Sequence, residues 1–284
     1  AARFVDEYDE DRPFMMMVGF AGPHDPYDPP ADRARRFDPA AMPPPLPPTP
    51  ATERLAPELI AAHAGGSSRV DLSTFSDADK RRVRAHYCAL IEMIDEQVGA
   101  ILQALERKGL AENTVVVFAS DHGDFVGDFG YLGKSLFFEP SIHVPLIVRR
   151  PGAAAGTRVR ETVTITDLFA TFLALAGIDH ASGTDSVVLP GIGLDAGEVR
   201  THVLGATSHG FALDDGRFRL ARYADGTATL FDLKEDPRER ANLIEASSHA
   251  AHRERLDRQL ARAVHRAILA SNEDRRYPDR KSVV

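Results

Sequence analysis

Continuous apolar stretches of strand length alternate with amphipathic stretches of helical spacing over the first two thirds of the chain. The apolar stretches cover residues 13–20, 114–119 and 144–148. Because their apolar residues are consecutive rather than alternating, they are typical of strands covered on both faces. Together with the helices between them, they predict an α/β domain with a largely parallel central sheet flanked by helices.

Two helices are predicted between these strands. Ser76, followed by Asp79, is typical of a helix start, and apolar residues recur at three- and four-residue spacing over residues 83–105. Gly109 is well placed to end this helix. A shorter amphipathic stretch at residues 166–176 predicts the second helix.

The pattern changes beyond residue 195, where short alternating segments replace the long apolar ones. They cover residues 201–206, 216–223 and 228–233, and a helical pattern follows at 248–269. These segments predict a small antiparallel sheet with a terminal helix. We therefore divide the chain into an α/β part, residues 1–195, and a C-terminal α+β subdomain, residues 196–284. A proline-crowded segment at 26–57 predicts a long surface loop that can cover a cleft.

Composition limits the partners and the location of the protein. The chain has 284 residues and a net charge of −8, without a dense Lys/Arg block, which argues against nucleic-acid binding. Its apolar runs are far shorter than the roughly 20 residues that span a membrane. The single cysteine, Cys88, excludes an intrachain disulfide. Neither an initiator Met nor a signal-peptide pattern begins the chain, so we expect a truncated start and favour a cytoplasmic location.

The strongest chemical signal is the pair Asp121 and His122, directly after the predicted strand at 114–119. Ligands of open α/β sheets bind at the carboxyl ends of parallel strands, so a carboxylate beside an imidazole there is typical of half a metal site. The same two residues are equally typical of a strand-end turn, with Asp121 capping the next segment and His122 in solvent.

Two further residues are candidates for binding an anion beside that pair. Lys134 follows a glycine-rich stretch at 127–133, which can fold back and bring an ammonium group to an oxyanion. His24 follows the apolar stretch at 13–20 and so is also placed at a predicted strand end. Taken singly, Lys134 is typical of an exposed lysine and His24 of a loop histidine.

Three segments of the chain resemble the sulfatase family. Residues 22–27, Gly-Pro-His-Asp-Pro-Tyr, resemble its proline-flanked histidine motif. The longest match is Ser-Asp-His-Gly-Asp-Phe-Val-Gly-Asp-Phe-Gly-Tyr-Leu-Gly-Lys at 120–134, continued within 138–147. Residues 230–243 are similar to a segment of the family's C-terminal subdomain. This resemblance implies an alkaline phosphatase-like fold and the hydrolysis of a sulfate ester.

Carried over position by position, the resemblance also implies the roles of four residues. Asp121 and His122 would bind a divalent metal ion, while His24 and Lys134 would bind the sulfate group or assist the leaving group. The metal is calcium in typical members and manganese in the branch that hydrolyses phosphonate esters. Oxygen ligands suit calcium, whereas an imidazole makes softer ions more competitive. The expected partner is a small sulfate ester, and nothing in the sequence indicates an oligomeric state.

The residue that attacks the ester is not found in this chain. The family makes its nucleophile, a formylglycine, in a Cys/Ser-x-Pro/Ala-x-Arg motif, and Cys88 lacks that context. We expect Cys88 to be a buried, unreactive helix residue. Two ligands are too few for calcium, which takes about six to eight. We therefore expect part of a sulfuric ester hydrolase that is inactive alone. A phosphonate or phosphate ester hydrolase and a non-catalytic binding module are the alternatives.

Overall fold

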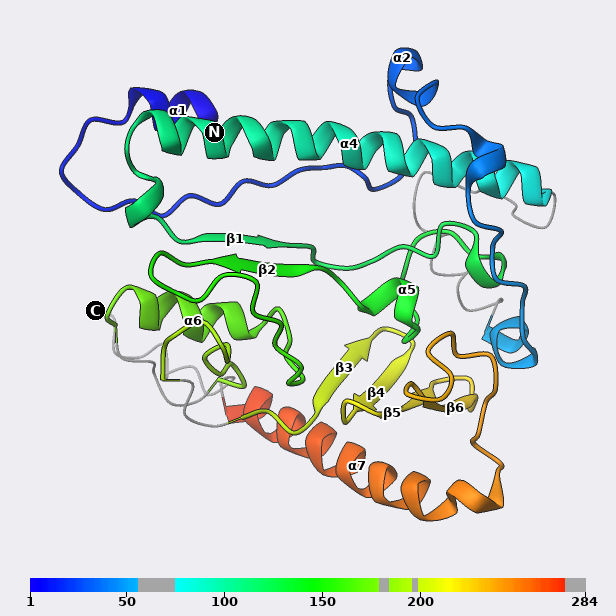
Figure 1. The fold of residues 1–284 in the computed structure, drawn as a ribbon. Helices are drawn as coiled ribbons and strands as arrows, with labels where there is room; N and C mark the ends of the chain where they lie inside the picture. Colours follow the sequence, from blue (N-terminus) through cyan, green and yellow to red (C-terminus); the bar gives the residue numbers. More distant parts are fainter. Residues whose placement is uncertain (56–74, 179–183, 196–198, 274–284) are drawn as a thin grey trace, which may run out of the picture.

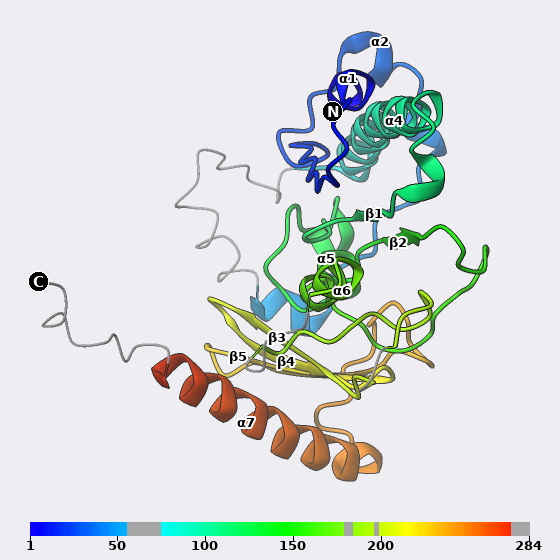
Figure 2. The same ribbon diagram turned by 90° about the vertical axis from the view of Figure 1, so that its left-hand side faces the viewer.

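The computed structural model of the protein describes residues 1–55, 75–178, 184–195 and 199–273 (Figure 1). Its helices include α1 (Ala2–Glu7), α2 (Ala31–Ala34), α4 (Asp77–Arg107), α5 (Glu139–Ile142), α6 (Asp167–Leu175) and α7 (Ala250–Glu273). Its strands include β1 (Val116–Ala119), β2 (Leu146–Arg149), β3 (Val203–Thr207), β4 (Gly210–Asp214), β5 (Phe218–Tyr223) and β6 (Ala228–Asp232). Both views show helices α1 and α4 on one side, strands β1 and β2 next, then α5 and α6, then a four-stranded sheet, and α7 on the other side (Figures 1 and 2).

Helix α4 confirms the long helix predicted from Ser76. The Ser76 hydroxyl accepts a hydrogen bond from the Asp79 amide at 3.2 Å, and the Asp79 carboxylate accepts one from the Ser76 amide at 3.0 Å. This reciprocal pair satisfies two amides that the first helical turn leaves without partners. The helix ends shortly before Gly109, whose φ of +67° is suited to glycine. No helix among the described residues is long and apolar enough to cross a membrane.

The first residues of the chain form helix α1, which the sequence pattern did not predict. Val5 of α1 is fully buried against Ala104 and Leu105 of α4. Residues 13–20, predicted as a buried strand, belong to no strand, and Met15 and Met17 in it are exposed. The prediction of a buried strand at residues 13–20 was therefore wrong, although Phe14 and Met16 pack against the cluster around Val5.

Strands β1 and β2 confirm the positions of the other two predicted strands but pair in an antiparallel ladder. Val117 lies opposite Val148 and Ala119 opposite Leu146. Their apolar side chains are only partly covered, and Phe118 and Ile147 are exposed. The parallel arrangement expected for a larger sheet is thus absent from this pair, because two neighbouring strands can adopt either direction and the apolar pattern does not distinguish them.

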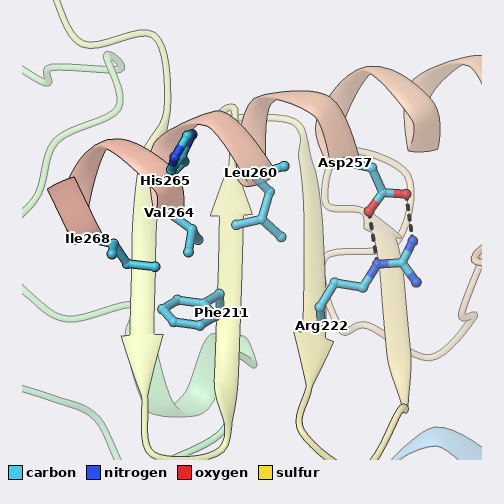
Figure 3. A pocket seen from close by; sticks show the side chains of 8 residues that line it. Phe211, Arg222, Asp257, Leu260, Val264, His265 and Ile268 are labelled. Carbon is cyan, nitrogen blue, oxygen red and sulfur yellow. Dashed lines mark hydrogen bonds and ion pairs between the residues drawn. The ribbon is translucent and has the colours of Figure 1, made fainter.

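The C-terminal sheet confirms the predicted antiparallel sheet and terminal helix. Its four strands pair in the order β3-β4-β5-β6, each antiparallel to the next. Strand β4 was not predicted, although its apolar run Phe211-Ala212-Leu213 was a visible signal. Helix α7 covers one face of the sheet by packing Leu256 and Leu260 against apolar residues of the strands. Figure 3 shows the border of this contact, where Arg222 and Asp257 form an ion pair beside a shallow apolar groove.

An aromatic cluster connects the irregular segment after β1 to the C-terminal sheet. Phe125, Phe129 and Phe138 are almost completely buried and pack against one another, with ring centroids 5.4–6.3 Å apart. Phe138 also contacts Phe231 of β6 at 5.6 Å. This apolar contact joins the two parts that the sequence analysis separated at residue 195, and that boundary stays a prediction.

Arg219 forms a buried ion cluster at the same junction. Its guanidinium donates hydrogen bonds to Glu239 at 2.8 Å, to Asp214 at 2.7 Å and to Glu139 of α5 at 2.5 Å. The Arg219 side chain is 5% exposed and that of Glu239 is fully buried. His143 adds a further contact to Glu139 at 2.6 Å. The cluster therefore ties α5 to strand β5 through charges of which Arg219 and Glu239 are buried, while Glu139 is 25% exposed.

We predict that Arg219→Ala strongly destabilises the protein. The substitution leaves buried carboxylates without their cation, and breaking a buried pair in this way costs about 3–5 kcal/mol. Urea unfolding measures the loss of unfolding free energy. Arg222→Ala in the same strand is the matched control, because the side chains of Arg222 and its partner Asp257 are 42% and 34% exposed and the loss of such a pair should cost far less. Equal losses for the two variants would contradict the prediction.

The pKa values of Glu239 and Glu139 in this cluster are shifted in opposite directions. Burial raises the pKa of Glu239 to about 7, despite Arg219. Burial also acts against ionised Glu139, but hydrogen bonds from His143 and Arg219 lower the pKa of Glu139 to about 2. The hydrogen bond to Glu139 raises the pKa of His143. Glu139 therefore stabilises the fold increasingly as pH rises from about 2 to the ordinary glutamate value of 4.5.

Above pH 4.5, Glu239 has the opposite effect on stability. The unfolded chain releases the Glu239 proton near 4.5, whereas the folded protein holds it to about 7, so the unfolding free energy falls over this window. We predict a shallower fall for Glu239→Gln, since the amide cannot ionise. Denaturant unfolding of both proteins between about pH 5 and 7.5 checks this. Parallel profiles would show that Glu239 does not titrate in that window.

Candidate functional site

The structure brings the four residues singled out in the sequence into one site. The Lys134 ammonium donates a hydrogen bond to Nε2 of His24 at 2.5 Å. The rings of His24 and His122 meet edge to face, with centroids 5.7 Å apart. Asp121 lies beside His122, with 3.5 Å between its Oδ2 and the ring Nε2. The geometry therefore unites all four residues, while their chemical roles stay predictions.

His24 is held by its neighbour in the chain. Its Nδ1 lies 2.9 Å from the carbonyl oxygen of Asp25 and 2.9 Å from a carboxylate oxygen of the same residue. Nδ1 donates to these oxygens, which leaves the Nε2 lone pair to accept the hydrogen bond from Lys134. The His24 side chain is 46% exposed, so its ring is open to a ligand from solvent.

His122 is oriented in a comparable way, toward Asp121. Its Nδ1 donates a hydrogen bond to the carbonyl oxygen of Gly123 at 2.8 Å, so the lone pair of Nε2 faces the Asp121 carboxylate. Partial burial acts against ionised Asp121, but the charges of His122 and Lys134 lower the pKa of Asp121 below its ordinary value. One carboxylate oxygen and one imidazole nitrogen are therefore directed at the same small space.

This donor pair fits half of a divalent-metal site. A histidine that binds a metal through one ring nitrogen commonly donates its other N–H to a carbonyl, as His122 does to Gly123. Within the described ranges, no group of three or more His, Cys, Asp or Glu residues is arranged to hold a metal ion. This pair could therefore hold a metal ion only together with ligands from outside the described residues.

Gly123 sets the path of the backbone after His122. Its amide donates to the carbonyl oxygen of Ser141 in α5 at 2.8 Å. A Cβ atom at this position would lie 2.1 Å from the carbonyl oxygen of Pro140, which is far inside van der Waals contact. Only glycine lets the segment after His122 approach α5 so closely, and α5 in turn is held by Arg219 through Glu139.

Asp124 lies two residues after His122, and both of its carboxylate oxygens accept hydrogen bonds. Its Oδ1 accepts hydrogen bonds from the amides of Val126 at 2.8 Å and Gly133 at 2.9 Å. Its Oδ2 accepts one from the Tyr27 hydroxyl at 2.8 Å. Burial raises the pKa of Asp124, and burial together with the nearby Asp124 charge raises the pKa of Tyr27. The turn to Val126 is a signal visible in sequence, whereas the contact with Tyr27 is not.

Cys88 lies in α4 and is partly buried. Burial raises the pKa of its thiol, although Arg84 opposes the shift. A raised thiol pKa reduces the thiolate that could act as a nucleophile at neutral pH. The structure therefore agrees with the expectation that Cys88 is not the attacking group.

Comparisons with known proteins point to one family. A model of the Sulfatase family matches residues 1–178. The choline-sulfatase of Rhizobium meliloti is 32% identical over 252 residues, which cover 82% of this chain and 47% of that protein. The arylsulfatase of Clostridium perfringens is 27% identical over 266 residues, covering 89% and 53%. The chain thus spans about half the length of these two relatives.

Solved structures agree with these sequence relatives. The crystal structure of the phosphonate monoester hydrolase of Agrobacterium radiobacter is similar with a TM-score of 0.79 and 27% identity. The similarity covers 93% of this chain and 59% of the hydrolase chain.

We predict that Gly123→Ala displaces His122 and destabilises the protein. The new methyl group must push away backbone atoms of Pro140, and overpacking of this kind costs about 1–3 kcal/mol. NMR signals of the His122 ring and urea unfolding measure both effects. Gly99→Ala in α4 is the control, because no atom lies within 4 Å of its added Cβ and alanine favours a helix. An unchanged His122 signal in Gly123→Ala would disprove the proposed constraint.

Proposed function

The chain belongs to the sulfatase family, and we propose that it supplies the anion-binding groups and two metal ligands of a sulfate ester hydrolase. The alkaline phosphatase-like fold class predicted from the sequence is confirmed by its structural relatives. The observation that carries the proposal is the cluster in which Lys134 and His24 are in contact beside His122. An ammonium and two imidazoles that converge at one surface suit a small divalent anion.

In this proposal Lys134 and His24 act on the sulfate group. The Lys134 ammonium neutralises negative charge on the sulfate oxygens as the ester bond breaks. Nδ1 of His24 is already engaged with Asp25, so His24 acts through Nε2, which first takes up a proton and then donates it to the ester oxygen as a hydrogen bond or in a full proton transfer. The 2.5 Å contact between Lys134 and His24 supports this proposal. An anion placed between the two side chains would replace their one hydrogen bond by two charge-assisted ones.

Asp121 and His122 would hold the divalent metal ion. When bound, the metal would polarise the sulfate oxygens as a Lewis acid. We propose calcium, with manganese as the alternative, because a carboxylate favours the first and an imidazole makes the second competitive. The distance of 3.5 Å between Nε2 of His122 and Oδ2 of Asp121 supports a shared cation.

We further propose that this chain is inactive by itself. The two described metal ligands fall short of the about six to eight that calcium requires. The thiol of Cys88, the only cysteine, has a raised pKa and no suitable sequence context. The nucleophile and the remaining ligands would then come from residues that correspond to the rest of the relatives' length.

A phosphonate ester hydrolase is the second candidate within the same chemistry. The similarity to the phosphonate monoester hydrolase of Agrobacterium radiobacter, which covers 93% of this chain, favours it. The four residues of the site bind either tetrahedral anion. The preference of the completed enzyme for one ester must therefore be measured, as the ratio of kcat/KM for aryl sulfate and aryl phosphonate esters.

We predict that a fusion of this chain to the N-terminal half of a sulfatase relative hydrolyses aryl sulfates, and that a chelator abolishes the activity. In the fusion, Lys134→Ala and His24→Ala should each lower kcat/KM by about 10²–10⁴, because each removes charge stabilisation or proton transfer. Lys108→Ala at the end of α4 is the control and should have no effect.

Each other outcome of this experiment is informative. Full activity in the presence of the chelator would remove the metal from the proposal. Turnover by the unfused chain would show that it holds a complete site. Sulfate binding without turnover in the fusion would instead support a non-catalytic binding module.

A further inference from the structure

Asp124 connects the two loops that carry the anion-binding side chains. On one side its Oδ2 accepts the hydrogen bond of the Tyr27 hydroxyl, three residues after His24. On the other side its Oδ1 accepts the amide of Gly133, directly before Lys134. Tyr27 lies 97 positions before Asp124 in the chain, so a single carboxylate joins two distant segments.

The loop that contains His24 is anchored through Tyr27 at two points. Asp124 holds its hydroxyl at 2.8 Å, and its carbonyl oxygen accepts a hydrogen bond from Nδ1 of His86 in α4 at 2.9 Å. Both the backbone and the side-chain end of Tyr27 are therefore fixed. Because only two residues separate Tyr27 from His24, a shift of Tyr27 must move the imidazole.

The loop that contains Lys134 is anchored in a similar way through Gly133. Its amide donates to Asp124 at 2.9 Å, and its carbonyl oxygen accepts the amide of Phe125 at 2.9 Å. The positive φ angle of Gly133, +76°, turns the chain toward the site. The peptide unit before Lys134 thus depends on Asp124 and on the residue next to it.

We propose that Asp124 is a positioning residue that sets the distance between His24 and Lys134 without touching the substrate. This inference rests on the proposed anion-binding role of His24 and Lys134. A carboxylate that only stabilised its own turn would need the Val126 contact alone. The hydrogen bonds of Asp124 to Tyr27 and Gly133 reach the loop that contains His24 and the loop that contains Lys134.

The test compares Asp124→Ala with Asp124→Asn in the 284-residue chain. Asparagine keeps an oxygen for the two amides and can donate its N–H to the Tyr27 hydroxyl oxygen, so it should rescue the arrangement, whereas alanine removes every contact. NMR of the His24 ring nitrogens reports the hydrogen bond from Lys134. We expect Asp124→Ala to shift these signals and to weaken binding of sodium sulfate, measured with calcium present, by about ten- to a hundredfold.

Asp167→Ala separates positioning from general stability. Asp167 is a buried aspartate that accepts the amides of Thr164 and Val187 at 3.0 and 3.1 Å, far along the chain from the site. Its loss should lower the unfolding free energy while leaving the His24 signals and sulfate affinity unchanged. If Asp124→Ala does not fold, Tyr27→Phe still tests the proposal, because it must shift the His24 signals while the bonds of Asp124 to Val126 and Gly133 persist.

The outcomes distinguish this inference from the proposed function. If the wild-type chain does not bind sulfate, the anion-binding role of this chain fails, yet the His24 signals still test the positioning role. Unchanged His24 signals in Asp124→Ala or Tyr27→Phe would overturn the inference, even with sulfate binding intact. Equal effects of Asp124→Ala and Asp124→Asn would also overturn it, since hydrogen-bond geometry would then not matter.

Discussion

The buried contact between Arg219 and Glu139 supports the geometry of the site from a distance. Glu139 begins α5, and the carbonyl oxygen of Ser141 in that helix holds the Gly123 amide. Gly123 in turn accepts the hydrogen bond that orients His122. Strand β5, far along the chain, is thus connected to His122 through one ion pair, one backbone hydrogen bond and one hydrogen bond from the His122 ring to the backbone.

Local patterns in the sequence were sufficient for the long elements. Helix α4 was predicted because its start has a capping pair and its apolar residues recur over many turns, and α7 because its spacing is equally regular. The antiparallel pairing of β1 and β2 was not predictable. A continuous apolar run shows that a strand is present but does not show in which direction its neighbour runs. Helix α1 was missed because only tertiary contact with α4 buries its Val5, and a short helix has little intrinsic stability.

The candidate site was predictable only in part, because some of its contacts join segments that are far apart in the sequence. Position after a strand and family resemblance identified His24, Lys134, Asp121 and His122, and the structure places them together. The hydrogen bond between Asp124 and Tyr27 was not predictable, because the two residues are 97 positions apart in the chain. Long-range contacts of this kind leave no periodic signal in sequence.

Exposure of the site determines how strongly its charges can act. The side chains of His24 and Asp121 are 46% and 82% exposed, respectively, and Phe118 and Ile147 of the neighbouring strands are exposed as well. In water the interaction between charges a few ångströms apart is several-fold weaker than in a covered site. The roles proposed for these four groups would therefore be strongest if other residues excluded solvent from the site.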